Sequence, residues 1–331
     1  MITAMIAVGT ALALNRGIAV KTLDAAATEQ RRDRLEHHVA VLAGAIGERN
    51  LMHYGNLDLA ADYIAGEMSR TGIAPEEQAY RVRAGALRRK WRQYHYENQT
   101  YRNLILEIPG RSAPDEIVVI GAHYDSAPVP GCRAANDNAS GVAAVLELAR
   151  EFAAQPQDKT LRFVAFANEE PPFFWTRNMG SAVYARSCRD NKEKIVAMLS
   201  LETIGCYSEQ PGSQRYPLPL LSRFFPDRGN FIAFVADSGA KKLQRQCLTA
   251  FRRAAVFPAE GAALPWIIPR IGSSDHFPFR RRHYPALMVT DTAPYRDRTY
   301  HTNRDNPDHL NYRCMARVVN GLSAVIVDLA N

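Results

Sequence analysis

The sequence predicts a single α/β domain of the three-layer α/β/α type, with a mixed, mostly parallel central sheet. Short, nearly continuous apolar runs, such as 160–167 (TLRFVAFA) and 195–201 (IVAMLSL), are typical of parallel strands covered on both faces. Segments with apolar residues at helical spacing lie between these runs, and the connections are short. Strands that alternate with helices in this way indicate one doubly covered sheet. Neither an internal repeat nor a linker divides the chain.

Helices and strands can be assigned along the chain from these patterns. Asn56 is suited to cap a helix that Gly72 ends, and Pro109 with Gly110 ends an apolar strand. Helical spacing predicts helices over 29–46, 57–71, 141–152, 178–188, 241–254 and 312–329. Alternating or continuous apolar runs predict strands over 78–84, 101–108, 117–121, 160–167, 195–201, 231–236 and 284–290.

The amino-terminal segment differs from the rest of the chain. Its first charged residue is Arg16, and its apolar run is short for a membrane span but suits a signal peptide, although a basic n-region is missing. We therefore expect residues 1–28 to be an apolar segment, either a signal or an anchor remnant, and residues 29–331 to be the folded domain. This predicts an exported protein, periplasmic, extracellular or membrane-anchored, and leaves a cytoplasmic location open. Only this segment would bring the protein to a membrane.

Charge and cysteine content argue against several protein classes. The net charge of +7 comes from 41 basic and 34 acidic residues, and basic residues cluster in 81–92 and 280–282. No signature of a nucleic-acid-binding module accompanies these runs, so we interpret them as solvated surface and expect no nucleic-acid partner. The five cysteines form no CxxC pair, and their odd number argues against a fully disulfide-bonded scaffold.

Side chains that bind metals follow four of the predicted strands. The carboxyl ends of parallel strands meet at one edge of a sheet, so we expect these side chains around one cleft. Two imidazoles and three carboxylates, one of them bridging, can hold two divalent ions roughly 3.5–4 Å apart. Such a set suits zinc and leaves room for manganese or cobalt. The residues are His123 and Asp137 after strand 117–121, Glu169 and Glu170 after 160–167, Glu202 after 195–201, and His301 after 284–290.

Individual residues of this set have alternative interpretations. Asp137 could simply cap the following helix, whereas Glu202 at an apolar strand end is costly unless it is paired or bound to metal. Asp125 is placed to accept the second ring N–H of a ligating His123. Of two adjacent glutamates only one is expected to face a given metal, which would leave the other as a general base.

Six motifs resemble, in order, the motif series of the co-catalytic dizinc aminopeptidase family. They are His123-Tyr-Asp-Ser, Ala-Asn-Asp137-Asn-Ala-Ser-Gly, Asn-Glu169-Glu-Pro, Ser-Leu-Glu202-Thr-Ile-Gly, Ser274-Asp-His-Phe and Tyr300-His-Thr. The family includes bacterial leucyl aminopeptidases, aminopeptidase Y, the catalytic domain of glutamate carboxypeptidase and, as a single-zinc branch, glutaminyl cyclases. The similarity covers roughly residues 30–330.

The resemblance implies a zinc-dependent peptide hydrolase, an aminopeptidase with two Zn²⁺ per chain for which Mn²⁺ or Co²⁺ could substitute. Many relatives have Asp where this chain has Glu202, so the metal spacing could differ. The implied ligands are His123 and Glu202 for one ion, Glu170 and His301 for the other, and Asp137 for both, with Glu169 as general base.

Two regions near the motifs are expected to contact the peptide substrate or support the site. His276 would be a substrate-contacting or supporting residue rather than a ligand. The segment 171–175 (PPFFW) directly follows the two glutamates, and we expect it to shape the wall where a substrate side chain lies.

Other functions stay open at this point. Glutaminyl cyclisation on the same fold needs one zinc ion and a pocket for a glutamine side chain, and the complete ligand set favours two metals instead. A non-catalytic binding domain would have lost ligands, and this chain has lost none. No carboxylate can be assigned to a substrate's free amino terminus, so carboxypeptidase and endopeptidase action also stay open, as does the oligomeric state.

Overall fold

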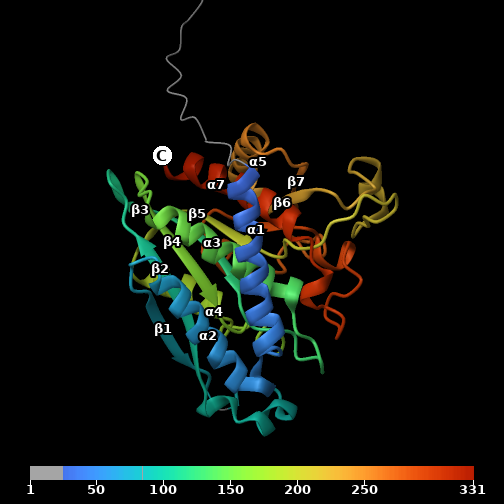
Figure 1. Cartoon of the computed structure of the whole chain (residues 1–331). Coiled ribbons are helices and arrows are strands. Elements are labelled where there is room, and N and C mark those ends of the chain that lie inside the picture. The colour runs from blue at the N-terminus through green and yellow to red at the C-terminus, as the bar shows by residue number, and fades with distance from the viewer. Residues whose placement is uncertain (1–24, 84) are drawn as a thin grey trace, which may run out of the picture.

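The structure is a computed structural model that describes residues 25–83 and 85–331. In this part of the chain, eight strands form one sheet with the order β1-β2-β4-β3-β5-β8-β6-β7 (Figure 1). Neighbours from β4 through β3 and β5 to β8 are parallel, as are β6 and β7, whereas β1–β2, β2–β4 and β6–β8 are antiparallel. The predicted mixed, mostly parallel sheet is therefore confirmed. The strands are β1 (Glu76–Arg81), β2 (Thr100–Ile108), β3 (Ala113–His123), β4 (Lys159–Phe166), β5 (Lys194–Leu201), β6 (Ile232–Asp237), β7 (Ala259–Leu264) and β8 (Ala286–Thr290).

Helices cover both faces of this sheet. Figure 1 shows α1, α2 and α3 in front of the strands, and α5 and α7 pack on the same side. The short helices α4 and α6 contact each other and cover the opposite face. The bounds are α1 (Ala25–Val39), α2 (Tyr54–Ser69), α3 (Gly141–Ala153), α4 (Gly180–Asp190), α5 (Lys241–Ala254), α6 (His276–Arg280) and α7 (Tyr312–Ala330).

The central strands are apolar throughout because each face of the sheet has its own core. Successive side chains of a strand point to opposite faces. In β3, Val118 and Ile120 belong to the large cluster under α3 and α7, whereas Val119 packs with Phe166 and Phe279 in a second cluster. The continuous apolar runs in the sequence therefore reflect burial on both sides.

The structure differs from the predicted elements in a few places. Helix α1 begins at Ala25, so the last residues of the predicted 1–28 segment are helical, while 1–24 and the predicted signal or anchor lie outside the described residues. Strand β7 and helix α6 are not among the predicted elements, because AEGAAL lacks β-branched residues and five residues are too few to show helical spacing. In the described part of the chain, no helix is long and apolar enough to cross a membrane.

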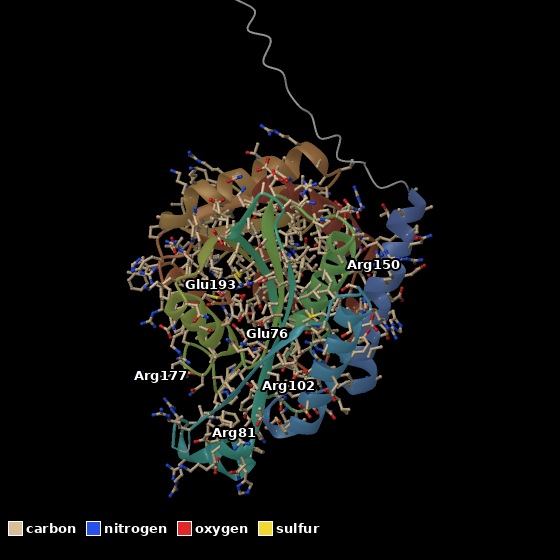
Figure 2. All side chains as sticks on the ribbon, turned by 90° about the vertical axis from the view of Figure 1, so that its left-hand side faces the viewer. Glu76, Arg81, Arg102, Arg150, Arg177 and Glu193 are labelled. Carbon is tan, nitrogen blue, oxygen red and sulfur yellow. The ribbon has the colours of Figure 1, made fainter. Side chains whose placement is uncertain are left out.

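The basic segment between β1 and β2 projects from the body of the domain. Figure 2 labels Arg81 at this end of the molecule, and the short helix Arg89–Tyr94 continues the projection. Strand β2 begins here and runs antiparallel to β4, so the projection leaves the sheet at the edge where the parallel strands end.

Gly141 lies where α3 comes closest to the sheet, and we expect this contact to tolerate no side chain. A Cβ at this position would meet the Asn138 side chain, the Leu201 carbonyl and the Ala122 methyl group. Gly141→Ala should lower the free energy of unfolding by about 1–3 kcal/mol. Gly66→Ala in α2 is the matched control, because no atom lies within 4 Å of its Cβ. The control should be neutral or stabilising by up to about 1 kcal/mol. Urea denaturation measures both, and equal losses would contradict this account.

Candidate metal centre

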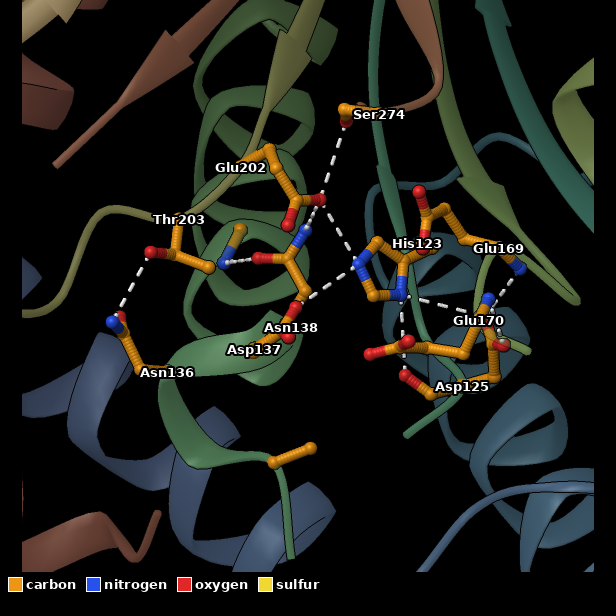
Figure 3. A network of polar contacts seen from close by, with 12 residues as sticks. His123, Asp125, Asn136, Asp137, Asn138, Glu169, Glu170, Glu202, Thr203 and Ser274 are labelled. Atoms are coloured by element: carbon orange, nitrogen blue, oxygen red, sulfur yellow. Dashed lines mark hydrogen bonds and ion pairs between the residues drawn. The ribbon is translucent and has the colours of Figure 1, made fainter. Parts of the chain in front are cut away.

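Loops at the carboxyl edge of the sheet bring the predicted ligands together. His123 is the last residue of β3, and its partner in the register with β4 is Phe166, just before the loop that carries Glu170. Glu202 directly follows β5, and its backbone N–H donates to the carbonyl of Val289 in β8 at 2.8 Å. Figure 3 shows that their side chains face a common space.

Two sets of three ligand-type side chains share Asp137. In the first set, His123 Nε2 lies 3.0 Å from Glu202 Oε2 and 3.3 Å from Asp137 Oδ1. In the second set, His301 Nε2 lies 2.8 Å from Glu170 Oε1 and 2.9 Å from Asp137 Oδ2. Each oxygen of Asp137 therefore faces a different histidine, as in a carboxylate that bridges two cations.

The ligand atoms of these two sets that point toward one another are better placed to bind metal ions than to form hydrogen bonds with one another. They are buried but form no hydrogen bond within the described structure, although they approach to ion-pair distance. Leaving buried polar groups unpaired is costly, so this arrangement is suited to binding a cation. Two imidazoles and three carboxylates are ligands that zinc accepts. The atoms concerned are His123 Nε2, both oxygens of Asp137, Glu170 Oε1 and His301 Nε2.

Crowding of like charges perturbs the ionisation of the whole cluster. Burial, together with the charge of Asp137, raises the pKa of Glu170 to about 7 and that of Glu202 to about 8. Burial opposes protonation of His301, but Asp137 and Glu170 together raise its pKa to about 10. A bound cation would reverse both effects, since it favours ionised carboxylates and neutral imidazoles.

Asp125 contacts both His123 and the loop that carries Glu169 and Glu170. Its Oδ1 accepts a hydrogen bond from the Glu169 N–H and its Oδ2 from the Glu170 N–H, both at 2.9 Å. The predicted contact with His123 is present but long, with Nδ1 3.4 Å from Oδ1 and 3.2 Å from the Asp125 carbonyl oxygen. The sequence did not indicate that Asp125 also anchors the loop of the two glutamates.

Three residues that sequence reasoning did not select hold the ligands in place. Asp305 accepts hydrogen bonds from the N–H groups of Asp137, at 3.1 Å, and of the residue before it, at 2.7 Å. Asn138 Nδ2 and Ser274 Oγ donate to Glu202 Oε2 at 3.3 and 3.2 Å (Figure 3). Asn138 and Ser274 lie inside the motifs quoted above, so their motif positions could have identified them as residues of the site. Asp305 lies in none of these motifs.

Glu169 lies beside the cluster without belonging to either ligand set. Its side chain is buried, with 5% of the residue exposed. Burial raises the pKa of Glu169 well above its usual value, and the charges of Glu202 and Glu170 add to this although His123 opposes it. Glu169 is therefore a buried carboxyl group next to the cluster that takes part in neither ligand set.

The side chain of His276 lies outside both ligand sets. It begins α6, is buried, and donates its Nε2–H to the carbonyl of Ile271 at 2.7 Å. Burial lowers the pKa of His276 to about 4, so it is neutral. His276 thereby fixes the backbone of Ile271, which lines an apolar pocket beside Glu202. Direct contact of His276 with substrate stays a prediction.

An apolar pocket of about 110 Å³ opens beside Glu202. Its wall comes from one face of the last three strands of the sheet and from segments that cover them. Segment 171–175 does not line this pocket, because Phe173 packs on Tyr101 and the exposed Trp175 stacks on Phe174, and its expected role at a substrate wall stays a prediction. Lining side chains include Ala233 and Val235 of β6, Ala262 and Leu264 of β7, Met288 of β8, and Leu221, Phe225 and Tyr300.

His301 belongs to one ligand set only, so removing it should affect metal binding by that set and leave the other set complete. We expect His301→Ala to bind one zinc ion fewer than the parent protein, measured by elemental analysis after dialysis. His53→Ala is the control, since His53 lies on the surface with 44% of its side chain exposed. The parental zinc content in His301→Ala would remove this residue from the centre.

Known proteins share both the sequence and the fold of this chain. The profile described as "Peptidase family M28" matches residues 103–326. "Uncharacterized protein YfbL" of Escherichia coli (strain K12) is 36% identical over 303 residues, 89% of this chain and 87% of that protein. "Aminopeptidase YwaD" of Bacillus subtilis (strain 168) is 28% identical over 221 residues, 65% of this chain and 42% of that protein.

Among solved structures, BSAP, "a zinc aminopeptidase from Bacillus subtilis", has the same fold with a TM-score of 0.68 and 17% identity. The match covers 89% of this chain and 94% of BSAP. The family profile extends from β2 into α7 and so includes every motif of the centre. The chain therefore belongs to peptidase family M28 and is a zinc-dependent metallo-exopeptidase.

Proposed function

We propose that this protein is an aminopeptidase that releases the amino-terminal residue of a peptide at a centre of two zinc ions. The observation that carries the proposal is the pair of ligand sets that meet on the two oxygens of Asp137. When bound, the two ions polarise the scissile carbonyl and lower the pKa of water to about 7. A complete ligand set on each side also favours this reaction over single-zinc glutaminyl cyclisation.

Each ligand has a defined task in this proposal. Asp137 would be shared by the two ions, and Asp305 keeps the loop of Asp137 in place by accepting hydrogen bonds from its backbone N–H groups. Asp125 orients the ring of His123 and the loop of both glutamates, so the two ligand sets keep their relative position. His123 and Glu202 hold the first ion, and Glu170 and His301 hold the second.

Glu169 is the general base of the proposed reaction. It takes a proton from the attacking water and returns it to the leaving amine. Its position beside both ligand sets supports this role, because burial and the neighbouring carboxylates raise its pKa and so favour its taking up a proton. Its neighbour Glu170 faces His301, which leaves Glu169 free of ligand duty.

The apolar pocket beside Glu202 supports a substrate with a bulky apolar amino-terminal side chain. Its strand wall presents Ala233, Val235 and Met288, which are neighbours across β6 and β8. Burial of an apolar side chain there contributes roughly 1.5–3 kcal/mol to substrate binding. The amino-terminal segment supports an exported enzyme, which would meet such peptides outside the cytoplasm.

Removing the carboxylate of Glu169 tests the general base. We expect Glu169→Gln to keep the parental zinc content and to lower kcat on aminoacyl-nitroanilides by roughly 10²–10⁴-fold. Glu76→Gln on the exposed face of β1 is the matched control and should keep the parental rate. Parental kcat in Glu169→Gln would assign the base to another group.

Narrowing the pocket tests the substrate class. We expect Ala233→Leu to lower kcat/KM for leucyl and phenylalanyl substrates by about 10-fold or more, and that for alanyl substrates far less. Ala79→Leu, on an exposed position of β1, controls for added volume elsewhere. Amino-terminally blocked peptides should not be cleaved by the parent enzyme. Equal losses on all substrates, or cleavage of blocked peptides, would contradict the proposal.

A further inference from the structure

Among the described residues, a third group of ligand-type side chains lies outside the metal centre. Cys206 lies in the loop after β5, Asp297 in the loop after β8, and His309 in the turn of 3₁₀-helix Pro307–His309 before α7. Asp297 Oδ2 lies 3.3 Å from Cys206 Sγ, and Asp297 Oδ1 lies 3.2 Å from His309 Nε2. One ligand atom from each residue lies within 4.8 Å of the other two.

We propose that Cys206, Asp297 and His309 bind a further zinc ion through a thiolate, a carboxylate and an imidazole. Zinc binds sulfur at about 2.3 Å and nitrogen or oxygen at about 2.0–2.2 Å, so a tetrahedral site separates neighbouring ligand atoms by roughly 3.3–3.6 Å. The separations of 3.3 Å from Cys206 Sγ to Asp297 Oδ2 and of 3.2 Å from His309 Nε2 to Asp297 Oδ1 are close to this range, with each carboxylate oxygen facing one of the other two ligands. A thiolate with an imidazole selects zinc over magnesium or calcium, which prefer oxygen ligands.

The Cys206–Asp297–His309 group is buried on one side and open to solvent on the other, so a metal ion can reach it. Cys206 and Asp297 are buried, whereas 41% of the His309 side chain is exposed. All three line a cavity of about 420 Å³ together with polar groups such as Ser208 and Gln210. An ion can therefore enter through the cavity, and water there can supply the fourth ligand.

The carboxylate of Asp297 is already fixed in the orientation that a ligand needs. Its Oδ1 accepts hydrogen bonds from the N–H and O–H of Thr299, both at 2.7 Å, and its Oδ2 accepts one from Asn136 Nδ2 at 3.2 Å. Hydrogen bonds of this kind orient ligating carboxylates in metal sites. Although burial opposes it, His309 and Thr299 lower the pKa of Asp297 to about 2, which keeps it ionised.

Metal binding at this group displaces protons that now lie between the side chains. The thiol proton of Cys206 passes to solvent as the sulfur becomes a thiolate. His309 binds through Nε2 as a neutral imidazole protonated on Nδ1, and any proton displaced from Nε2 passes to solvent. The resulting site combines one zinc ion with two anionic ligands and is therefore neutral.

The further ion would stiffen the loop that carries the bridging ligand of the metal centre. Asn136 precedes Asp137, and its Nδ2 contacts both Asp297 Oδ2, at 3.2 Å, and Thr203 Oγ1, at 3.1 Å (Figure 3). Fixing Asp297 to a metal would hold Asn136 and, through the backbone, the position of Asp137. The inference does not depend on the proposed peptide hydrolysis.

Cobalt substitution tests the site separately from the metal centre. Only a thiolate ligand produces a sulfur-to-cobalt charge-transfer band in the near ultraviolet, and the ligand sets around Asp137 contain no sulfur. We expect the full chain loaded with Co²⁺ to show this band. Cys206→Ser should lose the band and one equivalent of metal. Cys188→Ser, which changes a buried cysteine on α4, is the matched control and should keep both.

A second variant leaves the thiol in place. His309→Ala removes the exposed ligand and should weaken cobalt binding at this site by about 10-fold or more, followed by titration of the same band. A parent protein without the band overturns the proposal, as does a band that persists in Cys206→Ser. A band lost only in Cys132→Ser would place the sulfur ligand elsewhere. None of these readouts measures hydrolysis, so failure of the proposed function would leave them unchanged.

Discussion

The carboxylate of Asp137 is the constraint on which the rest of the site depends. Both of its oxygens are buried without a hydrogen bond, and each faces the ring of a different histidine. A buried charge in that condition is strongly unfavourable unless cations compensate it. The fold must therefore supply the remaining ligands on two sides of one side chain, and it does so from four separate segments of the sequence.

The parallel strands satisfy this constraint because their carboxyl ends lie side by side. His123 ends β3, and β4 and β5 pair with β3 on either side, so the loops that carry Glu170 and Glu202 begin next to it. The loops themselves are held by side chains rather than by strand pairing. Asp125 fixes the glutamate loop, and Asp305 fixes the loop of Asp137. The centre is thus built from loops whose positions are fixed by buried hydrogen bonds.

The pocket and the centre meet at β8 and at the segment before His301. The pocket wall comes from β6, β7 and β8, which lie at one end of the sheet, and from the segments covering them. Glu202 lines the pocket and donates its backbone N–H to Val289 of β8, and Tyr300 of the pocket wall stacks on the ring of His301. A substitution in β8 or at Tyr300 can therefore affect both the pocket and the centre.

Local patterns in the sequence determined the fold class and selected the candidate ligands that the structure brings together. Apolar runs of strand length reveal a sheet buried on both faces, and His, Asp or Glu at the end of such a run has few other uses than chemistry. Residues without a local pattern escaped this reasoning. Strand β7 is weakly apolar, and Asp305 carries no motif, although it holds the loop of Asp137.

Only the tertiary structure decided how these residues meet. The apolar pocket is built from β6, β7 and β8 together, and no pattern in the sequence indicated it, because cross-strand neighbours leave no periodic trace. The assignment of each Asp137 oxygen to its own histidine likewise needs coordinates. So does the meeting of Cys206 with Asp297 and His309. Contacts between distant segments depend on chain packing, which no single stretch of sequence encodes.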